Sequence, residues 1–252
     1  MARVWELPGA GLTAQFRTDP IRWPADVDCQ QLPDGTCVAL TIGHGRKTVT
    51  WDVTAGRMRH IGGGHRGWSS CVTCAQDSLG RPIGLTGGHD NRVNEWDLRT
   101  GRRRSRFRIV PRRVFWSRPV TGHAVAIRLL ALRDGRSAVF VVTGDGKIRA
   151  LRPRRFTPGA RRTAAIPGTA VALGTLGNGR AVAVTGRPDG ILQVWAADEL
   201  IGASERREPL CEIDIGIVTS DISAAGNGTF IVATPNGLTA VLLYPRIFEA
   251  QG

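Results

Sequence analysis

Long apolar runs are missing from this chain of 252 residues. No segment approaches the ~20 consecutive apolar residues that a membrane-spanning helix needs. The first residues, MARVWELPGAGLTAQF, also lack the apolar core of a signal peptide. These absences argue against a helical membrane protein and a secreted one. We therefore expect a cytoplasmic protein that makes no contact with a membrane.

Cysteine is scarce and irregularly spaced. The five cysteines lack the spacing of a disulfide framework, so reduced and mostly buried thiols are expected at Cys29, Cys37, Cys71, Cys74 and Cys211. The pair Cys71 and Cys74 forms C-x-x-C, but no second such pair or spaced histidine pair accompanies it. Positions i and i+3 of a strand point to opposite faces. We expect no metal or redox site there.

Catalytic motifs are also absent. H-E-x-x-H, G-x-S-x-G and G-x-x-x-x-G-K-[ST] do not occur. The stretch GGGHRG at 62–67 matches G-x-G-x-x-G, but it lies between two predicted strands without the helix that a dinucleotide site needs. His44 and His89 lie in equivalent turns, where they are either solvated or turned toward a shared ligand. The sequence predicts no catalytic residue, cofactor or metal, and hence no enzyme.

Lysine is nearly missing from a strongly basic chain. Lys47 and Lys147 are the two lysines among 34 basic residues, and 21 acidic residues leave a formal charge of +13. Such a charge favours a polyanionic partner. The excess of arginine over lysine is also typical of codon supply in a GC-rich genome. Composition alone leaves both interpretations open.

What the chain has in quantity is glycine, 32 residues, and a repeated pattern. Turns that contain glycine recur at Asp34-Gly35, Leu79-Gly80, Asp134-Gly135, Asn178-Gly179 and Asn227-Gly228. After each, a predicted strand ends at Trp51-Asp52, Trp96-Asp97, Leu151-Arg152, Trp195-Ala196 and Val241-Leu242, at intervals of 45, 55, 44 and 46 residues. A period near 45 with four short strands predicts an all-β propeller of five to six four-stranded antiparallel blades.

The best-preserved repeat contains Gly64-His65 and, after 30 further residues, Trp96-Asp97. With LTGGHDNRVNEWDLRTG at 85–101, the chain resembles the WD40 repeat β-propellers. The resemblance implies a buried tetrad of His65, Thr86, Asp90 and Trp96. Indole donates, hydroxyl and imidazole donate and accept, and carboxylate accepts, so the four can satisfy one another in an apolar setting.

Other repeats keep part of this pattern. The fourth has Thr185, Asp189 and Trp195 without a histidine, and these are its expected anchors. In the third, which has His123 and Asp145, Leu151 stands where the period places tryptophan. In the first, Gly45 stands where the turn aspartate is expected.

The repeats predict a single domain over 1–252. It consists of a partial blade at 1–22 and blades at about 23–66, 67–118, 119–167, 168–216 and 217–252. We expect the carboxy-terminal part of a longer propeller, with a compact five-blade ring as the rival. Unpaired edge strands would favour self-association.

Arginine gathers in two stretches, 99–118 and 149–162, which also contain aromatic residues such as Phe107. Arginine can bind phosphate or carboxylate in a forked geometry. A partner-binding basic surface is expected at Arg102, Arg103, Arg104, Arg112, Arg113, Arg118, Arg154 and Arg155, and a solvated outer strand is the alternative. The expected function is a non-catalytic scaffold for protein–protein interaction, as the sensor or docking end of a larger protein, with an acidic partner. The alternative is a module that binds nucleic acid or another polyanion.

Overall fold

A computed structural model describes residues 2–6, 11–16, 21, 23–44, 46–110, 123–131, 137–153, 160–201 and 208–245. These residues form antiparallel strands and one short helix, so the predicted all-β class is confirmed. The chain divides into two compact units, Met1–Ile127 with Arg155–Gly159 and Arg128–Arg154 with Ala160–Gly252. The prediction of one domain over 1–252 stays a prediction.

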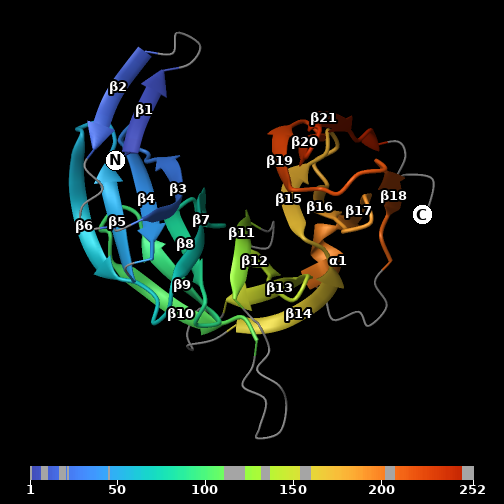
Figure 1. Cartoon of the computed structure of the whole chain (residues 1–252), viewed down its shortest axis with the longest axis horizontal. Helices are drawn as coiled ribbons and strands as arrows, with labels where there is room; N and C mark the ends of the chain where they lie inside the picture. Colours follow the sequence, from blue (N-terminus) through green and yellow to red (C-terminus); the bar gives the residue numbers. More distant parts are fainter. Residues whose placement is uncertain are drawn as a thin grey trace, which may run out of the picture. The chain divides into compact units, whose positions relative to one another are not determined.

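The first unit contains a two-stranded sheet and two four-stranded sheets (Figure 1). The small sheet pairs β1 (Ala2–Glu6) with β2 (Gly11–Phe16). The first four-stranded sheet contains β3 (Pro24–Gln31), β4 (Cys37–Gly43), β5 (Lys47–Asp52) and β6 (Arg57–Gly63). The second contains β7 (Ser69–Gln76), β8 (Pro82–Gly88), β9 (Arg92–Asp97) and β10 (Arg103–Arg108).

Strand β11 (Ala124–Ala131) crosses the division between the units and opens the third four-stranded sheet. That sheet continues with β12 (Ser137–Thr143), β13 (Lys147–Pro153) and β14 (Ala160–Pro167). The fourth contains β15 (Ala170–Thr175), β16 (Ala181–Gly186), β17 (Ile191–Ala196) and β18 (Cys211–Asp214), with helix α1 (Ala197–Ile201) after β17. The last described sheet has three strands, β19 (Asp221–Gly226), β20 (Thr229–Thr234) and β21 (Gly237–Leu242).

Burial differs between the inner and outer strands of the first two four-stranded sheets. Every residue of β8 and nearly every residue of β4 is buried, whereas the outer strand β6 is mostly exposed. Inner strands are covered on both faces, which is why CVALTIG and PIGLTGG read as continuous small or apolar runs.

Sheets pack face to face within each unit. In the first unit Leu40 lies against Gly84, where an added Cβ would come within 2.4 Å of a Leu40 methyl carbon. In the second unit the Phe230 ring occupies the same kind of space beside Gly174. Glycine on these strands therefore allows a large side chain of the neighbouring sheet to fill the core.

The predicted glycine turns have the backbone that glycine permits. Gly35, Gly80, Gly179 and Gly228 have positive φ angles of 84°, 70°, 79° and 75°, while Gly135 lies outside the described residues. Each turn joins the first and second strands of its sheet, and each sheet falls within one predicted repeat.

Candidate functional site

The four residues of the expected tetrad form one chain of hydrogen bonds in the second sheet. Trp96 Nε1 donates to Thr86 Oγ1 at 3.0 Å, and Thr86 Oγ1 lies 3.0 Å from His65 Nε2. His65 Nδ1 lies 2.8 Å from Asp90 Oδ1. A neutral imidazole with its hydrogen on Nδ1 lets the indole donate to the hydroxyl, the hydroxyl to the imidazole and the imidazole to the carboxylate, so that all three hydrogen bonds run in one direction. Every polar side-chain group of the tetrad thereby has a hydrogen-bond partner.

Asp90 closes this chain as a carboxylate. Burial raises its pKa, but hydrogen bonds from the His65 ring and the Arg66 amide, together with the Arg106 charge, outweigh burial and lower it to about 2. The carboxylate is therefore ionised near neutral pH. Because both of its oxygens accept hydrogen bonds, it is a structural acceptor and not a free acid or base.

The fourth sheet keeps only part of the tetrad. Trp195 Nε1 donates to Thr185 Oγ1 at 3.0 Å, as Trp51 does to Thr41 at 2.7 Å in the first sheet. Asp189 does not join Thr185 and Trp195, because its half-exposed carboxylate pairs with Arg187. The expected set of Thr185, Asp189 and Trp195 is thus brought together only for the threonine and the tryptophan.

In the third sheet the residue in the tryptophan position is Arg149, so the expectation of Leu151 there is wrong. Trp51, Trp96 and Trp195 each pair with the residue two before the threonine, and Val141 pairs in the same way with Arg149. The buried Arg149 guanidinium donates to Thr143 Oγ1. It also binds Asp145 through two nitrogens, at 2.8 and 2.6 Å. The hydrogen bonds from Arg149, together with its charge, lower the pKa of Asp145 to about 2 despite burial.

The fold of these sheets has counterparts among solved structures. "Structure of U3-55K" matches with a TM-score of 0.62 and 14% identity, over 87% of this chain and 63% of that one. "Crystal structure of RRP9 WD40 repeats" matches with a TM-score of 0.61 and 14% identity, over 87% of this chain and 62% of that one. The chain has the WD40-repeat propeller fold. No family model and no curated protein sequence matches it. The chain spans less than two thirds of the length of these two WD40-type structures.

Five rings form a continuous row on the WD40-type sheets of the first unit, and we call this set the ring row: Trp23, His44, Trp68, His89 and His123. Successive ring centroids are 6.1, 4.8, 5.7 and 4.8 Å apart, alternating edge-on and stacked contacts. Trp23 is 75% exposed and Trp68 is 55% exposed. The two turn histidines are therefore neither isolated nor simply solvated.

The residues of the ring row occupy equivalent positions in successive repeats, and this regularity is visible in the sequence. Trp23, Trp68 and His123 each precede the first strand of a sheet by one residue. His44 and His89 each follow the second strand by one residue. The His44 amide donates to the Trp23 carbonyl at 3.4 Å, and the His89 amide donates to the Trp68 carbonyl at 2.8 Å. The backbone thus brings each turn histidine beside a tryptophan.

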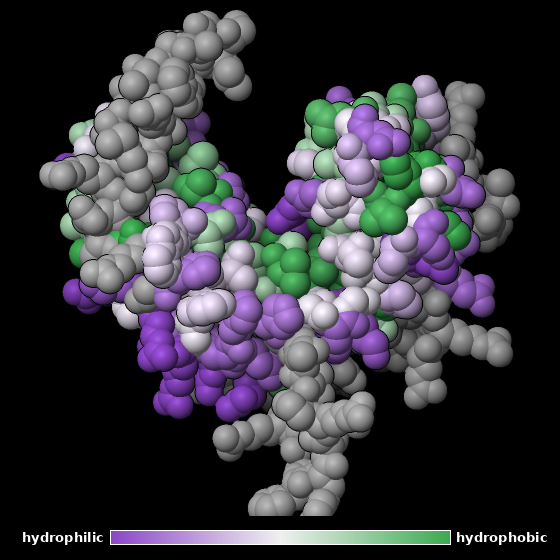
Figure 2. Space-filling model, viewed as in Figure 1, coloured by the Kyte–Doolittle hydropathy of each residue, from purple (hydrophilic) through white to green (hydrophobic). Residues whose placement is uncertain are grey.

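Of the expected basic surface, the structure describes Arg102, Arg103 and Arg104, all exposed on and just before β10. Figure 2 shows hydrophilic side chains gathered over this strand. Arg112, Arg113, Arg118, Arg154 and Arg155 lie outside the described residues. Phe107 is only 3% exposed, so the expectation of an aromatic surface residue between the arginines is wrong for Phe107.

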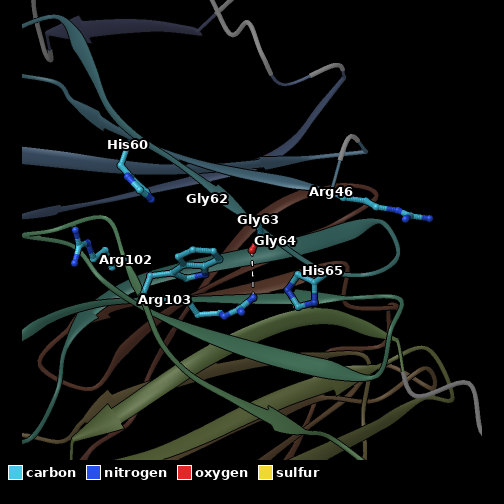
Figure 3. A pocket seen from close by; sticks show the side chains of 9 residues that line it. Arg46, His60, Gly62, Gly63, Gly64, His65, Arg102 and Arg103 are labelled. Carbon is cyan, nitrogen blue, oxygen red and sulfur yellow. Dashed lines mark hydrogen bonds between the residues drawn. The ribbon is translucent and has the colours of Figure 1, made fainter.

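A pocket of about 490 Å³ opens beside the outer strands β6 and β10, and we call it the rim pocket (Figure 3). Its lining includes Arg46, His60, Arg102, Arg103, the glycine run Gly62–Gly64, and the tetrad residues His65 and Trp96. Arg103 Nη1 donates to the Gly63 carbonyl at 3.3 Å. Sequence reasoning named Arg102 and Arg103 but missed Arg46 and His60, because these two come from the preceding repeat.

The described residues show neither of two other kinds of site. In them no group of three histidine, cysteine or acidic side chains is arranged to hold a metal ion. Their one helix is far too short to cross a membrane. Cys71 and Cys74 lie on β7 as thiols and not as a disulfide, and burial raises the pKa of Cys74 well above its ordinary value.

Proposed function

We propose that this chain is a non-catalytic interaction scaffold that binds a protein partner through the ring row. The observation that carries the proposal is the run of five contacting rings with two largely exposed tryptophans. Tryptophan and other large flat side chains dominate the free energy of protein interfaces. The WD40-type fold of the two matching structures agrees with an interaction role.

The ring row is held in place before a partner arrives. Its histidines are tied to the tryptophan carbonyls by backbone hydrogen bonds, and Trp68 follows the loop that the buried His65 anchors. Side chains that are already ordered lose little conformational entropy on binding. We therefore propose that the buried tetrads serve the function indirectly, by fixing the loops and turns that present the rings.

Binding by the ring row can be tested with the double variant Trp23→Ser/Trp68→Ser. Its matched control is Val218→Ser/Tyr244→Ser, which removes two exposed apolar side chains from the second unit and leaves β21 unchanged. Quantitative affinity purification should recover a partner with wild type and control and lose it with the tryptophan variant. Equal recovery by all three chains would refute the proposal. Purified partner should then shift the tryptophan emission of wild type to shorter wavelength.

We also propose that the chain is cytoplasmic. A separate proposal is that it self-associates through β21. In the described part of the chain β21 pairs with β20 alone, and Leu238 and Leu242 are exposed on it. An open edge strand with apolar side chains favours pairing with another strand. Sedimentation velocity should show a dimer whose fraction rises with concentration, and Leu238→Lys should remove it. A monomer at all concentrations would contradict the proposal.

A further inference from the structure

The rim pocket brings basic side chains from two consecutive sheets of the first unit into one opening. His60 comes from β6 and Arg46 from the turn before β5, whereas Arg102 and Arg103 come from the start of β10. No aspartate or glutamate is among its lining residues. A concave site with several cations and no carboxylate attracts anions.

The cations of the rim pocket are not neutralised by the protein. Within the described ranges, the Arg46 and Arg102 guanidinium groups have no hydrogen bond or ion pair. The Arg103 guanidinium donates one hydrogen bond of 3.3 Å, and its acceptor, the Gly63 carbonyl, is uncharged. Nearby, burial and the charges of Arg103 and Arg92 lower the pKa of Arg106. The positive potential around the pocket therefore remains available to a ligand.

The glycine run lies very close to two other residues that line the pocket. An added Cβ at Gly62 would lie 2.6 Å from the Trp96 ring, and one at Gly64 would lie 2.8 Å from the Arg46 carbonyl. Only glycine lets this segment approach both groups so closely. The volume of about 490 Å³ falls within the range of roughly 300–1,000 Å³ typical of small-ligand sites. It can hold a tetrahedral anion together with part of the side chain that bears it.

We propose that the rim pocket binds a phosphorylated side chain of a partner protein. A phosphate monoester carries close to two negative charges and three acceptor oxygens, which match several arginine donors converging on one point. Single-stranded nucleic acid would also need exposed ring faces for its bases. The tryptophan that lines this pocket does not supply one, because Trp96 is only 1% exposed. The site uses residues independent of the ring row.

The test uses calorimetric titration of the full chain with an alanine-flanked phosphoserine pentapeptide. The comparison ligands are its unphosphorylated twin and a short oligo-dT strand. The variant Arg46→Gln/Arg102→Gln removes the two unpaired guanidinium groups. The control Arg57→Gln/Arg180→Gln removes two positive charges that do not line the pocket. We expect the pocket variant to bind the phosphopeptide at least roughly tenfold more weakly, while wild type and control bind it alike.

Each other outcome overturns the proposal. Equal affinity for phosphorylated and unphosphorylated peptide would show that phosphate is not recognised. Equal weakening by the control would show a general charge effect. Tighter binding of oligo-dT, lost in the pocket variant, would assign the site to nucleic acid. Melting temperatures check that both variants fold. The variant Arg46→Lys/Arg102→Lys keeps both positive charges but removes the guanidinium forks, so it separates the effect of charge from that of the forked geometry. Trp23→Ser/Trp68→Ser should still bind the phosphopeptide, which separates this test from that of the ring row.

Discussion

The second and third four-stranded sheets contain different residues at the same position of the strand register. In the second sheet Trp96 donates to the Thr86 hydroxyl, and His65 and Asp90 extend the chain of hydrogen bonds. In the third sheet Arg149 donates to the Thr143 hydroxyl and binds Asp145 directly. The threonine is the common element, and it accepts from indole in one sheet and from guanidinium in the other.

The difference shows what each donor requires. An indole fills the core with apolar surface and needs one acceptor for its N–H. A guanidinium brings a charge into the core, so it needs a carboxylate beside it. Asp145 meets this need from the turn between β12 and β13 and replaces both the imidazole and the carboxylate of the second sheet.

The largest expected effect comes from removing the indole of the second sheet. Trp96→Ala should lower the free energy of unfolding by about 4 kcal/mol, because a large cavity opens and Thr86 loses a donor. Urea unfolding followed by far-ultraviolet circular dichroism measures this change. Trp68→Ala, at an exposed position, is the control and should cost about 0.5 kcal/mol or less. Similar losses for both would show that Trp96 is not a core anchor.

The pair in the third sheet should show a different response. Asp145→Ala should cost about 3 kcal/mol, because it leaves the buried Arg149 charge without its partner. Asp145→Ala/Arg149→Met removes that unpaired charge and should lie within about 1 kcal/mol of wild type. The same urea experiment tests both variants. A double variant no more stable than Asp145→Ala would argue against the buried ion pair.

Acid should weaken both sheets. The pKa of Asp90 and of Asp145 is about 2 in the folded chain, below the ordinary value of 3.8. A lowered pKa stabilises the folded state above pH 4, and the contribution is lost as the pH falls toward 2. We expect a loss of about 2 kcal/mol for each carboxylate. Asp90→Asn and Asp145→Asn should each reduce the pH dependence of unfolding in this window. Unchanged pH dependence in both variants would contradict the assignment.

The sequence was sufficient to predict the structural features that depend on regular spacing. Short strands and positive-φ glycine turns follow from local pattern. His65, Thr86, Asp90 and Trp96 have the spacing on which the resemblance to WD40 repeats rests, and the structure joins them by hydrogen bonds. Arg149 was missed because it lies six positions after Thr143, whereas Trp96 lies ten positions after Thr86. The shorter turn changes the register, and counting by period then reaches Leu151.

The surface sites were harder to predict for a physical reason. The sequence alone does not distinguish Trp23 and Trp68, which are exposed, from Trp51 and Trp195, which are buried. Only the packing of the folded chain does so. Arg46 and Arg102 are 56 positions apart, and the sheets bring them to one pocket. Asp189 follows Thr185 at the same spacing at which Asp90 follows Thr86, but without a histidine donor its carboxylate pairs with Arg187.

Hydrogen exchange of the indole N–H groups distinguishes the buried, anchoring tryptophans from the exposed ones. In a chain with ¹⁵N-labelled tryptophan, the Nε1–H signals of Trp51, Trp96 and Trp195 should persist in D₂O, because each is buried and donates to a threonine hydroxyl. Those of Trp23 and Trp68 should disappear at once. Rapid loss of the Trp96 signal, or lasting signals from Trp23 and Trp68, would contradict the account.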